Sequence, residues 1–398
     1  MVAYLFLTQI NLYILKVFFR RIHLYMGFAA GIVIMITCLT GAILVFETEL
    51  QHVFFKNRYY VLDKGPKLTA DSLINRATAK MPVVKVGSIK MYADKSRTAE
   101  VSLMQPAKKK ETSIVDKEKS AKSKPPEGNR LTVFVNPYSG EVIEIYNHKK
   151  SFFYFVMDLH RWMLGGDTGK MIVGICTLIF LFILITGIVL WWPKNKQIIK
   201  QRLKIKSDAG FKRLNHDYHV VLGFYSSIFL FVFAFTALAW SFEWFNKGIF
   251  TITNSSMERP KAPKNVVKDS TNKISVELVL QTVISQNDKA VYYNVALPKD
   301  STERYAVNIL STYAIHETAT DTYFVDAFNP AITGIQKFAD RNLGQKVRAT
   351  FRPVHVASIY GIPSKIIGLL ACLLGAFFPI SGYIMWYNRT KKKKQITA

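Results

Sequence analysis

A long uncharged segment ends in two tryptophans near the middle of the chain. Residues 171–192 contain no charged side chain, and these 22 residues would form an α-helix about 33 Å long, which is enough to cross a bilayer. Similar apolar segments occur at 25–46, 220–240 and 366–387. The chain is therefore predicted to be an α-helical integral membrane protein with four transmembrane helices.

Histidines recur at fixed distances from other residues in the two halves of the chain. His160 and His355 each precede a lysine by 10 residues, a glycine by 27 and a tryptophan by 31. His23 and His219 each precede a threonine by 17 residues and a Phe-Glu pair by 23 and 24. Such long shared spacings predict a tandem duplication. The predicted repeat units are about 23–192 and 219–388.

A polar region of about a hundred residues follows the first and the third apolar segment. Each region contains a stretch with helical periodicity and then alternating residues around a turn, so each is predicted to be a small inserted α+β domain. The predicted division is an interfacial N-terminal segment at 1–24, transmembrane segments at 25–47 and 216–242, juxtamembrane and transmembrane segments at 151–192 and 351–388, external domains at 48–150 and 243–350, a loop at 193–215 and a basic tail at 389–398.

Basic residues set the predicted orientation of the chain. Residues 193–213 include eight basic side chains and one acidic side chain, and the C-terminal tail is also basic. Short loops rich in Lys and Arg stay on the cytoplasmic side, so this loop and both termini are predicted to be cytoplasmic. The N-terminal apolar segment lacks a small-residue cleavage site and is expected to be retained. Membrane topology, with lipid as a partner, also accounts for the net charge of +26, and no nucleic-acid-binding motif is visible.

Four of the eight histidines occupy equivalent positions at the ends of the apolar segments. His23 and His219 fall at the cytoplasmic ends, and His160 and His355 fall at the external ends. Two units in the same orientation would be related by a pseudo-two-fold axis along the membrane normal, which would bring each pair to one depth. Because haem iron can take one axial nitrogen from each side of the porphyrin, the histidines predict two haem b sites. A helix of ~20 residues would separate the sites by roughly 30 Å.

Cations suited to haem propionates lie close to these histidines in the sequence. Arg161 and Arg352 flank the external histidines, and Lys170 and Lys365 recur at matching positions of the two units. Each of these side chains is a candidate partner for a haem carboxylate.

Two questions about neighbouring side chains stay open at this point. His216 lies three residues before His219 and could share its helix face, although the matching position of the first unit is Arg20, which favours His219 as the ligand. Glu47 and Glu243 recur at the external ends of the first and third segments. Solvation of a helix end, proton relay and cation binding are all open roles for these carboxylates.

The segments around the four histidines resemble a known family, the PepSY-associated transmembrane helix proteins, also called iron-regulated membrane proteins. The resemblance covers nearly the whole chain and is carried by FFRRIHLYMGFAAGIVIMITCLTGAILVFE from residue 18, DLHRWMLGG from residue 158, KRLNHDYHVVLGFY from residue 212 and PVHVASIYGIPSKIIGLL from residue 353. It implies that the external domains are PepSY-like, with the typical turn at 136–140 and a looser copy at 329–334.

The resemblance also implies a function. It suggests a bacterial inner-membrane protein that takes part in iron supply, and a haem-containing reductase of ferric siderophores or other ferric chelates in the periplasm. His23, His219, His160 and His355 carry over as ligands of the haem iron. Some members have a fused flavin- and NADPH-binding domain. Since no G-x-G-x-x-G fingerprint is present, the expected electron donor is a quinol or a separate cytoplasmic reductase.

Two other classes of function remain as alternatives. The external domains could bind a peptidase, a peptide or an envelope partner, with the apolar segments as anchors and no redox chemistry. The internal repeat is also compatible with a transporter of iron or of its chelate. The transporter is disfavoured because the apolar segments hold few polar residues at mid-depth, where a substrate site would lie.

Overall fold

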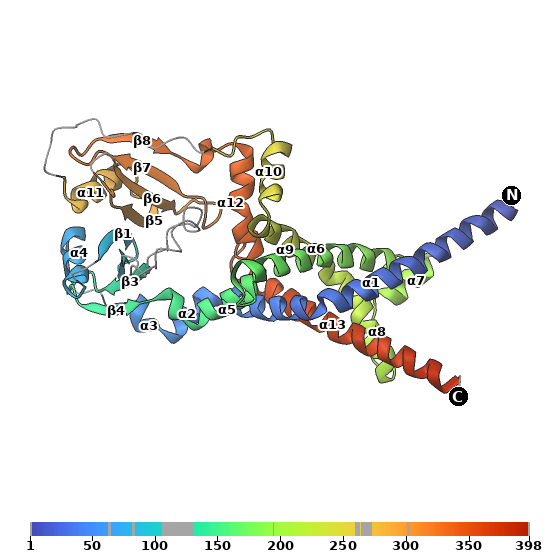
Figure 1. Cartoon of the computed structure of the whole chain (residues 1–398). Helices are drawn as coiled ribbons and strands as arrows, with labels where there is room; N and C mark the ends of the chain where they lie inside the picture. Colours follow the sequence, from blue (N-terminus) through green and yellow to red (C-terminus); the bar gives the residue numbers. More distant parts are fainter. Residues whose placement is uncertain are drawn as a thin grey trace, which may run out of the picture. The chain divides into compact units, whose positions relative to one another are not determined.

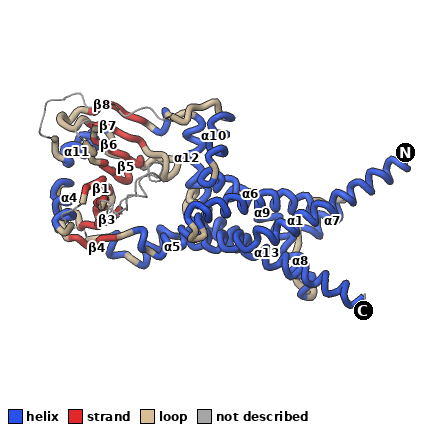
Figure 2. Tube along the Cα trace, in the orientation of Figure 1, coloured by secondary structure: helices blue, strands red, loops and turns tan. Residues whose placement is uncertain are grey.

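The structure is a computed structural model that describes residues 2–62, 65–81, 84–105, 130–193, 195–258, 263, 273–300 and 303–396. Side chains are described between residues 14 and 391. The chain forms two compact units. The helical unit is Met1–Glu47, Phe155–Asn254 and Val347–Ala398, and the sheet unit is Thr48–Tyr154 and Ser255–Lys346. Figures 1 and 2 show their helices and strands.

Four long helices form the core of the helical unit: α1 (Val2–Val45), α6 (Gly166–Trp191), α9 (Gly223–Ser241) and α13 (Ile362–Ile396). Within the described residues, four helical segments are long and apolar enough to cross a membrane: Ile14–Val45, Gly166–Trp191, Phe211–Ser241 and Ile362–Lys391. The chain is thus a membrane protein with four such helices. Helix α1 runs without a break through the predicted interfacial segment at 1–24 into the first span, and no Gly or Pro interrupts it before Gly27.

The four long helices pack in a closed ring, in which α1 contacts α6 and α13, and α9 also contacts α6 and α13. Consequently α1 lies diagonally across from α9. Small and hydroxyl residues occupy buried positions of these helices, including Ala30, Thr40, Ser226 and Thr236. Such residues allow helix backbones to approach closely in a membrane.

Shorter helices flank the long ones. They are α5 (Phe152–Trp162), α7 (Lys196–Arg202), α8 (Phe211–Asp217), a π-helical turn η4 (Tyr218–Leu222), α10 (Glu243–Ile252) and α12 (Leu343–His355). The α5–α6 turn has left-handed backbone at Met163 and Leu164, with φ of 47° and 58°. Gly169 permits this turn, because a β-carbon there would lie 1.6 Å from the carbonyl oxygen of Trp162. Ala357 is also left-handed, with φ of 54°, directly after α12.

The sheet unit contains one antiparallel sheet of eight strands in the order β4-β3-β2-β1-β5-β6-β7-β8. The strands are β1 (Lys85–Tyr92), β2 (Ala99–Met104), β3 (Arg130–Val135), β4 (Val142–Tyr146), β5 (Ala290–Ala296), β6 (Tyr305–Ser311), β7 (Asp321–Val325) and β8 (Ile332–Gln336). The remaining elements of this unit are α2 (Glu47–Phe54), α3 (Lys56–Tyr59), α4 (Ala70–Ala79), α11 (Val276–Gln286) and the 3₁₀ turns His148–Lys150 and Phe338–Asp340.

Strand β1 pairs with β5 and thereby joins the two polar regions that the sequence analysis treated as separate domains. Apart, each region would leave the edge of its first strand without backbone partners, and pairing removes both edges. Helices α4 and α11 cover one face of the sheet, where residues such as Ile89, Val133 and Val307 are fully buried. The polar regions therefore share one hydrophobic core.

The two helices of the sheet unit also cap one another. The carboxylate of Asp71 accepts hydrogen bonds from the backbone amides of Val276 and Glu277, both at 2.9 Å. In return, the Glu277 carboxylate accepts a hydrogen bond of 2.7 Å from the backbone amide of Ala70. Each helix start thus receives a negative charge from the other helix, where unpaired amides and the helix dipole favour it.

Candidate functional site

The four predicted histidines come together as two pairs inside the helical unit. The ring centres of His23 and His219 are 6.4 Å apart, with an angle of 75° between the ring planes. The ring centres of His160 and His355 are 6.3 Å apart, with an angle of 60°. We call these the first and the second histidine pair. All four rings are half-buried.

The first histidine pair joins the diagonal helices of the ring. His23 projects from α1, and His219 lies on the π-helical turn η4, which leads directly into α9. A π turn shifts the following side chains around the helix axis relative to a regular α-helix, and such turns are frequent at functional sites. Here the π turn carries His219, whose ring contacts the ring of His23.

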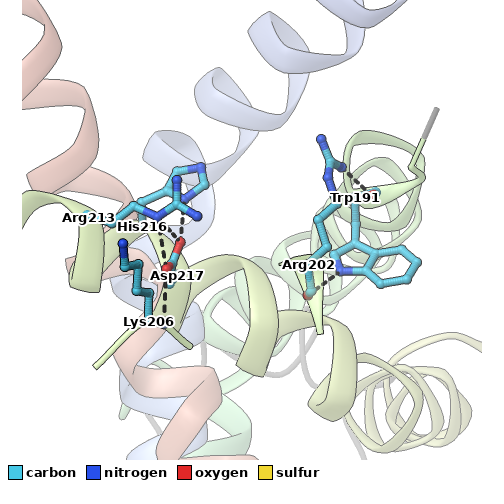
Figure 3. Close-up of polar contacts among 6 residues, drawn as sticks. All are labelled: Trp191, Arg202, Lys206, Arg213, His216 and Asp217. Carbon is cyan, nitrogen blue, oxygen red and sulfur yellow. Dashed lines mark hydrogen bonds and ion pairs between the residues drawn. The ribbon is translucent and has the colours of Figure 1, made fainter. Parts of the chain in front are cut away.

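His216 does not take part in the first pair. Its side chain is 54% exposed, and Nδ1 lies 3.2 Å from the carboxylate of Asp217. Arg213 reaches the same carboxylate at 2.8 Å, and Figure 3 shows His216, Arg213 and Lys206 around Asp217. The geometry therefore places His219, and not His216, opposite His23.

One basic side chain, Arg202, also interacts with the end of α6, as Figure 3 shows. The guanidinium of Arg202 donates hydrogen bonds to the backbone carbonyls of Leu190, at 2.9 Å, and of Trp191. A cation is favourable there because the last carbonyls of a helix have no partner within the helix.

The second histidine pair lies at the ends of the two shorter helices α5 and α12. His160 is followed within four residues by the left-handed turn at Met163 and Leu164, and His355 is followed by left-handed Ala357. These turns end the helices that carry the histidines and begin α6 and α13. The His160 ring therefore packs against α1, and the His355 ring packs against α9.

Every one of the four imidazoles has a hydroxyl partner at Nδ1. His23 contacts Oγ1 of Thr186 at 3.0 Å, and His219 contacts Oγ of Ser381 at 2.7 Å. His160 contacts Oγ1 of Thr40 at 3.0 Å and the backbone carbonyl of Thr37 at 2.9 Å. His355 has the same pattern, with Thr236 at 3.1 Å and the carbonyl of Phe233 at 3.0 Å.

These contacts select one tautomer of the imidazole rings. Each of the four hydroxyls donates its own hydrogen to a carbonyl one turn earlier in its helix; for Thr40 that bond is 2.7 Å long and for Thr236 it is 2.8 Å. The hydroxyl oxygen must then accept from the histidine, so Nδ1 carries the ring hydrogen. Nε2 is left with its lone pair, as a metal ligand requires.

A small residue follows each of these hydroxyl residues. Gly41, Gly187 and Gly382 come directly after Thr40, Thr186 and Ser381, and Ala237 comes after Thr236. A β-carbon at each glycine would lie 3.3–3.5 Å from Cε1 of the neighbouring imidazole. The absence of a side chain lets the ring lie close to the helix. The recurring Thr-Gly and Ser-Gly dipeptides are the sequence signal for these partners, which the spacing of the histidines alone does not reveal.

The separation within each pair suits two axial ligands of one iron. With a metal–nitrogen bond of about 2.0 Å and a ring nitrogen about 1.1 Å from its ring centre, imidazoles on opposite sides of an iron have ring centres about 6.2 Å apart. The observed values are 6.4 and 6.3 Å. No group of three or more His, Cys, Asp or Glu side chains gathers within the described residues. The two imidazole donors of each pair fit haem, whose porphyrin would supply the other four ligands.

A family model described as the PepSY-associated TM region matches residues 20–389. The chain belongs to this family. The matched region includes all four paired histidines of this PepSY-associated TM protein, as well as the hydroxyl residues that contact them. No curated protein matches the chain.

The two pairs of this PepSY-associated TM protein lie closer together along the bundle than the sequence suggested. His160 contacts Thr37 and Thr40, which are 14 and 17 residues beyond His23 on α1. At the helical rise this is about 21–26 Å, and not the roughly 30 Å that was expected. The difference arises because the turn after α5 lets His160 pack alongside α1 and not at its end.

The four candidate cations have different environments in this PepSY-associated TM protein. Arg161 is half-buried above the ring of Trp162, with Cζ 4.4 Å from the ring centre. Burial lowers the pKa of the Arg161 guanidinium. Arg352 is exposed and Lys170 is half-buried. Lys365 is buried, with Nζ 6.0 Å from the ring centre of Phe46.

The structure adds two residues to the second pair that the sequence analysis missed. The ring centre of Trp240 lies 5.2 Å from that of His355, and Cζ of Arg348 lies 5.0 Å from the Trp240 ring. Nε of Arg348 also donates a hydrogen bond of 2.7 Å to Asn246. Arg348 lies one helical turn before Arg352 on α12, which was the available signal for a second cation here.

Proposed function

We propose that this protein is a bis-histidine haem b protein with two haem sites, which moves electrons across the inner membrane of a bacterium to a ferric chelate outside. The main supporting observation is that the ring centres in the two imidazole pairs are 6.4 and 6.3 Å apart, close to the separation expected for two imidazoles that ligate one haem iron. His23 and His219 would hold one haem iron, and His160 and His355 would hold the other. Haem, when bound, supplies reversible one-electron transfer at these positions.

The side chains of this protein have three tasks in that proposal. The imidazoles provide Nε2 lone pairs, and the hydroxyl partners fix the tautomer and the orientation of each ring. Arg161, Arg352, Lys170 and Lys365 are the candidate partners for the propionate carboxylates. The aromatic and aliphatic residues around the rings keep water away, which controls the potential of the site.

Matching contacts in the two halves support the proposed tandem duplication. In the first half, His23 contacts Thr186 and His160 contacts Thr40. In the second half, His219 contacts Ser381 and His355 contacts Thr236. Each half thus contains two histidine–hydroxyl contacts between its own segments. This is the pattern expected for two units related by a pseudo-two-fold axis.

The direction of electron flow follows from the proposed orientation. The basic loop at 193–213 and the basic C-terminal tail are assigned to the cytoplasm. The first histidine pair is then at the cytoplasmic end, where a quinol or a separate reductase is the donor. The second pair is at the periplasmic end, where each electron converts one ferric chelate, such as a ferric siderophore, to the ferrous form. Hard oxygen ligands hold ferrous ion more weakly, so iron can leave the chelate.

The test uses the purified full-length protein from haem-replete cells. Its visible spectrum should show the bands of six-coordinate haem b, and reduction should sharpen them. Anaerobic addition of ferric citrate or a ferric hydroxamate siderophore should reoxidise the protein, with one ferrous ion trapped by a coloured chelator for each electron lost. A colourless preparation refutes the proposal.

Two further outcomes would separate the parts of this proposal. Haem that is present but not reoxidised by any ferric chelate would refute chelate reduction and leave the two haem sites standing. If His160→Ala and His355→Ala variants supported iron supply in cells as well as the parent, the role of a membrane-anchored binding module would be favoured instead.

A further inference from the structure

The sheet unit has a polar pocket on the face opposite α4 and α11. It spans β3, β2, β1 and β5, has a volume of about 240 Å³, and its lining includes Lys90, Glu100, Ser102 and Asn294. Residues that alternate with these along the strands, such as Ile89 and Val101, point into the hydrophobic core. The pocket is therefore built by the second face of the same strands and crosses the β1–β5 junction.

The ammonium of Lys90 is the central charge of this pocket. Its Nζ lies 4.2 Å from the ring centre of Tyr292 and 4.7 Å from that of Tyr92. Within the part of the chain that the structure describes, the ammonium has no hydrogen bond and no ion pair. Burial lowers the pKa of Lys90, and the nearby charge of Glu100 offsets this effect only in part. The two ring faces attract the ammonium, but a half-buried ammonium without a hydrogen-bond acceptor remains costly.

Glu100 does not supply that acceptor. It lies directly across from Lys90 in the β1–β2 pairing, but its Oε1 accepts a hydrogen bond of 2.6 Å from the hydroxyl of Tyr92. The same atom is 3.7 Å from the guanidinium of Arg97. Since Arg97 balances the charge of Glu100, Lys90 remains as a surplus positive charge, and exposed Arg130 adds another at the rim.

Uncharged donors complete the lining around Lys90. The hydroxyl of Ser102 is buried and has no hydrogen-bond partner among the described residues. Asn294 lies opposite Lys90 on the other side, in the β1–β5 pairing. A buried hydroxyl without a partner loses free energy relative to water, so it also favours a ligand that accepts hydrogen bonds.

We propose that this pocket binds a small ligand through an oxyanion, either a carboxylate or a phosphate, with Lys90 as the charged partner and Ser102 and Asn294 as hydrogen-bond donors. Its volume of about 240 Å³ is large enough to admit a small anion with several oxygen atoms, such as citrate. The site lies wholly in the sheet unit and does not depend on whether the histidine pairs bind haem.

Isothermal titration of the purified full-length protein tests this proposal, with iron-free citrate and inorganic phosphate as separate probes. Saturable binding of citrate alone identifies the carboxylate as the ligand group, and saturable binding of phosphate alone identifies the phosphate. Lys90→Met should weaken binding at least about tenfold, as expected for the loss of a charged hydrogen bond. The matched control is Lys85→Met, because Lys85 is exposed on the same strand and does not line the pocket.

A second variant keeps the test valid if Lys90→Met fails to fold. Asn294→Asp changes one atom type and adds a negative charge to the pocket, so it should also weaken binding about tenfold or more. Absence of binding to either probe in the parent protein overturns the proposal. An equal loss in Lys85→Met would indicate general surface charge and would overturn it as well.

Discussion

Alanine substitutions of the paired histidines should change haem content in a non-additive way. Because each pair supplies both axial ligands of one iron, His160→Ala is expected to lower the content from two haems per chain to one. The methyl group that remains at residue 160 has no lone pair and cannot replace the imidazole as a ligand. The double variant His160→Ala/His355→Ala removes the same site and should also retain one haem.

A double variant across the pairs should behave differently. His23→Ala/His160→Ala breaks both sites and is expected to retain no haem. The content is measured as the pyridine haemochrome absorbance of purified protein, divided by the protein concentration from amino-acid analysis. His216→Ala is the matched control, since His216 is three residues from His219 but contacts Asp217.

Two results would refute the assignment of ligands. If the double variant across the pairs kept as much haem as the double variant within one pair, the histidines could not be paired as the structure has them. If His216→Ala lost as much haem as His219→Ala, the turn η4 would present its residues differently from the geometry described above.

Three other substitutions test the contacts that support the site and the fold. Thr186→Val keeps the shape of the side chain but removes the hydroxyl at Nδ1 of His23, and should speed haem transfer to apomyoglobin as affinity falls roughly 10–100-fold. Gly375→Ala places a β-carbon 2.6 Å from Sγ of Cys38. It should lower the free energy of unfolding by about 1–3 kcal/mol, measured as a lower midpoint of thermal unfolding in detergent. Asp71→Ala removes the cap of α11 and should destabilise the sheet unit by about 1–2 kcal/mol in urea titrations followed by circular dichroism.

The first two of these substitutions have matched controls. Thr177→Val removes a hydroxyl from α6 that bonds only to the carbonyl of Val173 among the hydrogen bonds described, and should leave haem transfer unchanged. Gly27→Ala adds a β-carbon with no atom within 4 Å and should leave the thermal stability unchanged or raise it slightly. An effect of Thr177→Val equal to that of Thr186→Val would contradict the role given to the hydroxyl. For Asp71→Ala, an unchanged urea midpoint would show that the amides of α11 do not depend on this carboxylate.

The sequence by itself determined the class of protein and the candidate ligands. Long uncharged segments must form membrane helices, because backbone groups in a bilayer have to be hydrogen-bonded within their own segment. The fixed spacing of His23, His160, His219 and His355 relative to those segments was visible without any structure. These are properties of single segments or of their spacing, and they require no knowledge of which helix packs against which.

The tertiary structure decided how those residues meet. Thr186 is 163 residues from His23, and Thr40 is 120 residues from His160. Such partners are chosen by helix packing, which depends on side-chain shape along two helices at once. The same reason explains why the sequence favoured His219 over His216 only through the repeat: the π turn that carries His219 became visible in the tertiary structure.

The sheet shows the same division between local and long-range information. Alternating residues predicted the strands around the turn at 136–140, since one face of each strand had to be apolar. The pairing of β1 with β5 joins residues about 200 positions apart, such as Lys90 and Asn294, and strand pairing leaves no periodic trace that identifies its partner. The sequence therefore determined which residues could act, and packing between distant segments decided which of them lie close enough to act together.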